Sequence, residues 1–116
     1  MKQLLDFVNK LQLKDKMMDV EKQVEKMIRE GAFLVDVRSP MEFDEGTAKG
    51  AINFPLEDLE DRLADFEGKK NIVLFCRSGG RSAYAESVLN RNGINDTVNG
   101  GVWQYVDRIV REVEDN

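Results

Sequence analysis

The chain of 116 residues is long enough for one domain with a single core. Its 41% apolar and 34% charged content is ordinary for a globular protein, and its net charge of −5 disfavours a general nucleic-acid binder. With one cysteine and no histidine, neither an internal disulfide nor a zinc site is expected. No apolar run is long enough to span a membrane, and a free working thiol would fit the reducing cytoplasm.

Residues 1–16 are predicted to form an amphipathic helix, and we expect residues 1–18 to be an extension of a domain at 19–116. The apolar residues at helical spacing are Leu4, Leu5, Val8 and Leu11. Polar residues interrupt this stretch, so it is unlike a signal peptide. The helix could serve dimerisation, lie on a membrane surface or dock on its own domain. Docking on its own domain is the interpretation we favour, because amphipathic helices usually pack on the core they belong to.

A second helix is predicted from Asp19, which can cap it, to Gly31, which can end it. Its apolar face consists of Val20, Val24, Met27 and Ile28. A buried strand at 32–37 follows and ends in a charged pair, Asp36 and Arg38. Charged groups at a strand end are either functional, as in open α/β sheets, or form a salt bridge to a nearby loop. For Asp36 we favour the structural role.

The remaining chain alternates between strands and helices. In order, the predicted elements are a helical turn at 41–44, a short strand at 51–54, an acidic helix at 56–66, a central strand at 72–75, a helix that ends near Gly93, a brief strand at 97–98, a glycine turn at 100–101 and a last helix at 102–113. The central strand has no polar interruption, which indicates cover on both faces. This order predicts an α/β fold with a central, mostly parallel sheet flanked by helices on both faces, and with an extra N-terminal helix.

Cys76 stands where the central strand ends, and Gly79 and Gly80 lead from it into a helix. Backbone N–H groups at a helix start favour negative charge, and glycines let successive amides turn inward. Arg77 and Arg81 add positive charge. Such surroundings lower the pKa of a thiol, so Cys76 is predicted to be a nucleophile in an anion-binding loop. The alternative, a buried structural cysteine, gives the arginines no purpose.

Three segments resemble one known family. CRSGGRS at 76–82 resembles the active-site loop of the rhodanese family, the sulfurtransferases. LVDVRSPMEFDEGTAKGAINFP at 34–55 is similar to the first signature of that family, and VNGGVW at 98–103 to its closing segment. One departure lies in the first signature, where Thr47 and Ala48 replace the His-Ile that many members carry. The matching order and spacing of the three segments imply a rhodanese-like fold.

The resemblance implies a cofactor-free sulfurtransferase that works in two steps. Cys76 would take the sulfane sulfur of thiosulfate or another persulfide donor and pass it to cyanide, a thiol or a protein acceptor. The donor-binding residues that the resemblance implies are Arg77, Ser78, Gly79, Gly80, Arg81 and Ser82, with Asp36 and Arg38 in support. The mercaptopyruvate enzymes of the family have a neutral loop, so the arginines favour a small anionic donor. Because the chain has no second cysteine, the acceptor must be external.

Two other functions fit parts of the sequence. A cysteine phosphatase or arsenate reductase of a related fold would carry its arginine six residues after the cysteine, where this chain has Ser82; Arg81 comes one position earlier. The shorter loop suits a single sulfur better than a tetrahedral oxyanion. A non-catalytic protein-binding module is the other alternative, and the presence of Cys76 disfavours it, since such modules of this family tend to lose the cysteine.

Overall fold

The structure is a computed structural model that describes residues 2–115, with the side chains of 13–18 left aside. The described chain contains a four-stranded parallel sheet in the order β2-β1-β3-β4. The strands are β1 (Phe33–Asp36), β2 (Ile52–Asn53), β3 (Ile72–Cys76) and β4 (Thr97–Val102). The helices are α1 (Lys2–Arg29), α2 (Pro40–Glu45), the 3-10 helix η1 (Leu56–Phe66), α3 (Gly80–Arg91) and α4 (Trp103–Glu114). Within residues 2–115, none of the helices combines the length and apolar composition needed to cross a bilayer.

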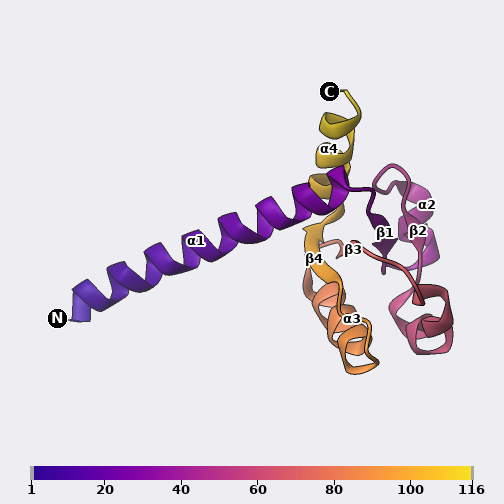
Figure 1. Ribbon diagram of the computed structural model, residues 1–116, viewed down its shortest axis with the longest axis horizontal. Helices are drawn as coiled ribbons and strands as arrows, with labels where there is room; N and C mark the ends of the chain where they lie inside the picture. Colours follow the sequence, from indigo (N-terminus) through magenta and orange to yellow (C-terminus); the bar gives the residue numbers. More distant parts are fainter. Residues whose placement is uncertain (1, 116) are drawn as a thin grey trace.

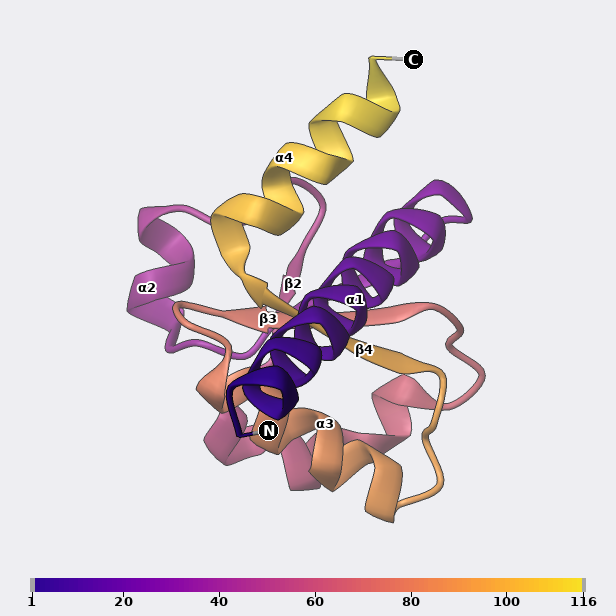
Figure 2. The ribbon, with the colours of Figure 1, turned by 90° about the vertical axis from the view of Figure 1, so that its left-hand side faces the viewer.

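The sheet separates two apolar layers, which confirms the predicted helices on both faces. Val73 and Phe75 of β3 pack with residues of α1 and α4. Ile72, Leu74 and Cys76 alternate with them and pack with residues of η1 and α3 on the other side. Every residue of β3 is buried, because a central parallel strand faces a helical layer on each side. Figure 2 shows α1 crossing in front of β3 and β4.

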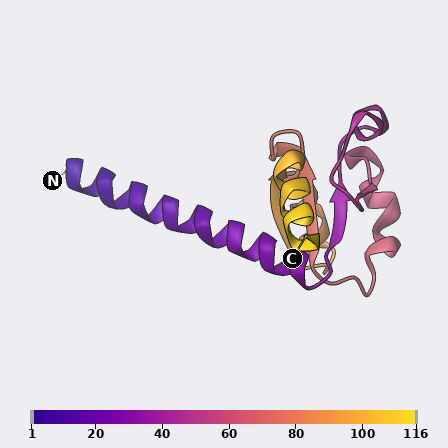
Figure 3. The same cartoon turned by 90° about the horizontal axis from the view of Figure 1, so that it is seen from above.

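The N-terminal region differs from the prediction, because α1 is one continuous helix in place of two. Asp19 lies in its interior and caps nothing, and the division predicted at 18/19 falls inside α1, where it stays a prediction. Docking of the first segment on its own domain is wrong as well: Leu4 is 63% exposed and Phe7 is 59% exposed. Figures 1 and 3 show the N-terminal part of α1 extending away from the domain, and residues 2–12 form this arm.

The positions of the apolar residues around α1 explain why the arm does not pack on the domain. Val8 and Val24 are sixteen residues apart, which places them about 160° apart around a helix of 3.6 residues per turn. Val24 is 0% exposed in the core, whereas Val8 is 39% exposed. The two apolar stripes of α1 therefore point in nearly opposite directions, and one straight helix cannot dock both on the same sheet.

Gly100 and Gly101 do not form the predicted turn. β4 continues through them to Val102, and the pairing changes register, because Leu74 faces Asn99 while Phe75 faces Gly101. Gly100 is the extra residue of this bulge. A Cβ atom at Gly100 would lie 2.8 Å from Val106 Cγ2 and 3.0 Å from a methyl group of Val73. Glycine is therefore required here for close packing under α4.

Candidate active site

Cys76 ends β3, and α3 begins four residues later, so the thiol lies beside the start of a helix as predicted. The residue is 0% exposed. Its sulfur accepts a hydrogen bond from the Gly79 N–H at 3.0 Å and lies 3.4 Å from the Ser82 hydroxyl. Gly79 has a φ of 95°, a left-handed conformation that glycine adopts at little cost. That conformation turns the amide of Gly79 toward the sulfur.

The surroundings of Cys76 favour its anionic form. Burial raises the pKa of the thiol, but the hydroxyl of Ser82 and the backbone N–H groups of Ser82, Ser78 and Gly79 outweigh it, so the pKa lies below that of an ordinary thiol. The cause is hydrogen bonding to the charged form. A purely structural cysteine in an apolar layer would show the opposite direction, because burial alone disfavours a thiolate.

Asn99 on β4 is a site residue that the sequence analysis did not identify. Its Oδ1 accepts hydrogen bonds from the Ser82 hydroxyl at 2.7 Å and from the Gly101 N–H at 2.9 Å. Its Nδ2 donates to the Gly79 carbonyl at 3.0 Å. Asn99 thus touches both residues that contact the sulfur. The sequence feature that could have identified Asn99 is its place directly before the paired glycines of the closing segment.

Arg81 is held by Glu42, a second residue that the sequence analysis missed. The guanidinium donates to Glu42 at 2.7 and 2.9 Å, which joins α3 to α2. Glu42 also closes a capping box with Ser39 at the start of α2, and the Ser-x-x-Glu spacing shows that box in the sequence. The charge of Arg81 is therefore already paired with that of Glu42, and its role in binding the donor stays a prediction.

The rest of the loop faces solvent. Arg77, Ser78 and Gly80 are exposed. Among the ion pairs formed by the described residues, none includes Arg77. Arg77 is accordingly the loop cation that is available to an incoming anion, while Arg81 is engaged with Glu42.

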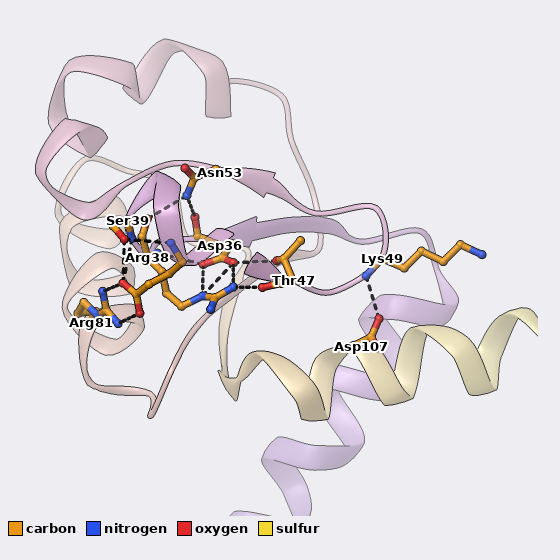
Figure 4. Close-up of polar contacts among 10 residues, drawn as sticks. Asp36, Arg38, Ser39, Thr47, Lys49, Asn53, Arg81 and Asp107 are labelled. Carbon is orange, nitrogen blue, oxygen red and sulfur yellow. Dashed lines mark hydrogen bonds and ion pairs between the residues drawn. The ribbon is translucent and has the colours of Figure 1, made fainter. Parts of the chain in front are cut away.

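Asp36 and Arg38 form a buried ion pair with each other, which is the kind of contact that the structural interpretation of Asp36 expects. Arg38 Nη2 lies 2.6 Å from Asp36 Oδ2, with Asp36 0% and Arg38 5% exposed. Thr47 donates its hydroxyl to the same carboxylate at 2.7 Å, and Arg38 donates to the Gly46 carbonyl. Figure 4 shows this cluster, which ties the end of β1 to the loop before β2.

This cluster explains the Thr47-Ala48 pair. The Thr47 hydroxyl satisfies a buried carboxylate oxygen, and Ala48 is 0% exposed in the layer under α1 and α4. Asn53 adds hydrogen bonds from its side-chain amide to the carbonyls of Asp36 and Arg38. The pair therefore belongs to the packing of the first signature, and its contacts do not reach Cys76.

The ion pair of Glu42 predicts a pH-dependent stability. Hydrogen bonds from Arg81 lower the pKa of Glu42 to about 2, below the ordinary value of 4.5. A carboxylate with a depressed pKa contributes stability above the ordinary value and loses it as the pH falls toward the folded value. The difference in urea midpoint between the wild type and Glu42→Gln should be constant above pH 4.5 and shrink between about 4.5 and 2. A difference independent of pH would contradict this assignment.

The family model named Rhodanese-like domain matches residues 20–106, which is most of the chain and includes Cys76, Glu42 and Asn99. The chain belongs to the rhodanese-like domain family. The fold, with a parallel sheet and helices on both faces, is the one that the resemblance of its three segments implied.

Relatives of this rhodanese-like domain include sulfurtransferases. The uncharacterized protein YqhL of Bacillus subtilis is 38% identical over 80 residues, covering 67% of this chain and 64% of YqhL. The thiosulfate sulfurtransferase PspE of Escherichia coli is 32% identical over 69 residues, covering 58% of this chain and 66% of PspE. The alignments thus span just under two thirds of each relative. The human single-domain sulfurtransferase TSTD1 superposes with a TM-score of 0.57 at 30% identity, covering 64% of this chain and 79% of TSTD1.

Proposed function

We propose that this rhodanese-like domain is a thiosulfate sulfurtransferase that carries sulfur as a persulfide on Cys76. The observation that supports it best is the hydrogen bond that the Gly79 amide donates to the sulfur, with the Ser82 hydroxyl in contact on a second side. A donor aimed at a sulfur stabilises it as an anion, and this favours the thiolate that attacks. The reaction belongs in a reducing compartment such as the cytoplasm, since the thiol must stay free.

The first step moves sulfur onto the enzyme. The Cys76 thiolate attacks the outer, sulfane sulfur of thiosulfate, a new S–S bond forms, and the S–S bond of thiosulfate breaks. Sulfite leaves with the bonding pair, so the charge balances without any proton transfer. Arg77 would attract the anionic donor, because it is the exposed cation of the loop. The negative charge of the persulfide lies on its terminal sulfur, one bond beyond Sγ, where the positive start of α3 would favour it.

The second step returns the thiolate. Cyanide or an external thiol, including a thiol on a protein, attacks the outer sulfur, and the persulfide bond breaks with its electron pair on Cys76. Since Cys76 is the one cysteine in the chain, the acceptor must come from outside it. The residue is 0% exposed, so both donor and acceptor reach the sulfur only when the exposed loop residues move aside.

Mass spectrometry of the intact chain tests the proposal. Reduced protein is incubated with thiosulfate, freed of reagent and weighed, and we expect the mass of one added sulfur atom located on Cys76. Cyanide should remove that mass and release thiocyanate. The matched control is protein whose Cys76 was first blocked with an alkylating reagent, which should gain nothing.

The same sample separates the alternatives. A phosphatase would ignore thiosulfate and hydrolyse an aryl phosphate in a step that depends on Cys76, and a binding module would do neither. If fully reduced protein gains no sulfur from thiosulfate or from a persulfide donor, the sulfurtransferase proposal fails.

A further inference from the structure

The hydroxyl of Ser82 has one hydrogen and three acceptors within reach. Asn99 Oδ1 lies at 2.7 Å, the Gly79 carbonyl at 3.2 Å and Cys76 Sγ at 3.4 Å. The sulfur is the most distant of the three, yet the hydroxyl stabilises a thiolate only if its hydrogen points there. The other two acceptors therefore decide whether the hydroxyl turns to the sulfur when the thiol ionises.

The Gly79 carbonyl is already occupied by two other donors. It accepts from the Ala83 N–H at 3.0 Å and from Asn99 Nδ2 at 3.0 Å. A carbonyl oxygen has two lone pairs, so the amide of Asn99 fills the place that the Ser82 hydroxyl would otherwise take. Without Asn99, donation to this carbonyl, three residues back in the chain, would be a common local hydrogen bond for a serine.

Asn99 Oδ1 can release the hydroxyl without being left unpaired. It also accepts from the Gly101 N–H at 2.9 Å, and that bond persists when the Ser82 hydrogen turns toward the sulfur. In the thiol form, the S–H donates to Ser82 and the hydroxyl donates to Asn99. In the thiolate form, the full charge on the sulfur attracts the hydroxyl more strongly than a neutral amide oxygen does.

We propose that Asn99 is a positioning residue that directs the hydroxyl of Ser82 to the sulfur of Cys76. Its Nδ2 donates to the Gly79 carbonyl, so Ser82 does not donate there. Its Oδ1 accepts from the Ser82 hydroxyl in the thiol form and loses that hydrogen bond when the thiol ionises. This inference rests on the proposed function only in taking Cys76 as the nucleophile. Its test measures the ionisation of Cys76 itself, so it stands or falls independently of whether thiosulfate is the donor.

The test is a pH titration of thiolate absorbance in the ultraviolet. Because the chain has one cysteine, the thiolate signal belongs to Cys76 alone, and absorbance does not require a reagent to reach the buried sulfur. Asn99→Ala should raise the pKa of Cys76 by about one unit, which is about a tenfold smaller thiolate fraction at a pH below both values. Asn99→Asp should raise it further, because a carboxylate retains the hydroxyl, cannot donate to Gly79 and adds negative charge near the sulfur.

Two comparisons make the outcome decisive. Asn95→Asp adds the same charge in an exposed loop and should leave the pKa of Cys76 within about 0.2 units of the wild type. In a Ser82→Ala background, the effect of Asn99→Ala should fall to less than half, because Asn99 acts through the hydroxyl. Asn99→Leu in that background replaces this test if Asn99→Ala does not fold, because it also lacks the side-chain amide and adds no charge. An unchanged or lower pKa in the Asn99 variants, or a full effect without Ser82, would overturn the proposal.

Discussion

Replacing Arg38 with alanine is expected to lower the free energy of unfolding by about 3–5 kcal/mol. The reason is the state of its partner: the Asp36 carboxylate is 0% exposed, and Arg38 pairs with it through Nε and Nη2. Without the guanidinium, a buried charge keeps only the Thr47 hydroxyl and the Arg38 backbone N–H. Domains are stable by only about 5–15 kcal/mol, so urea denaturation should show a much earlier midpoint.

Arg29→Ala is the matched control for this prediction. Arg29 forms an ion pair of similar length, 2.9 Å with Glu25, but both side chains are nearly half exposed. Exposed pairs of this kind contribute about 0–1 kcal/mol, so its midpoint should stay close to that of the wild type. If the two variants lose equal free energy of unfolding, burial of the Arg38 pair does not explain its contribution to stability.

In the proposed reaction, replacing Cys76 with serine should reduce thiosulfate turnover by about 10⁴-fold or more, because the nucleophile is lost. A serine hydroxyl is a poor nucleophile without a base, and the chain has no histidine. The fold should survive, since serine is similar in size and can still accept from the Gly79 N–H. Thiocyanate formation and the urea midpoint measure the two effects separately.

Ser87→Ala serves as the control for Cys76→Ser. Ser87 is exposed on α3, and its hydroxyl bonds only to the Tyr84 carbonyl among the described residues. Its turnover should equal that of the wild type. Turnover by Cys76→Ser at more than a hundredth of the wild-type rate would mean that another group carries the sulfur.

The cysteine loop was predictable because its signals are local. An uninterrupted apolar run marks β3, and the cysteine, paired glycines and helix follow within a few residues. Glu42 and Asn99 were missed because their partners are distant in the chain: Glu42 is 39 residues from Arg81, and Asn99 is 17 from Ser82. Periodicity and motif spacing report which residues lie near one another along the chain, but they do not report which side chains meet across it.

The predictions that were wrong in α1 and β4 failed for another reason, which is the same in both elements. Local preference predicts a cap at Asp19 and a turn at the paired glycines, because both residue types favour those positions on average. In α1 the helix continues through Asp19, and in β4 close packing against Val73 and Val106 requires the glycine at 100. Tertiary context overrides local preference in both places, and the sequence alone does not display that context.

The helical hydrogen bonds of α1 persist for different times in its two parts, because only one part packs on the domain. Around Val24, α1 opens only when the core layer opens, because that side chain is fully buried. Residues 2–12 keep only hydrogen bonds within the helix, and an isolated helix of that length is marginal in water. Such a segment unwinds and re-forms within about a microsecond, independently of the domain. We therefore expect proton exchange and proteolytic cleavage to be fastest in residues 2–12, and cooperative unfolding of the chain to report the stability of the domain alone.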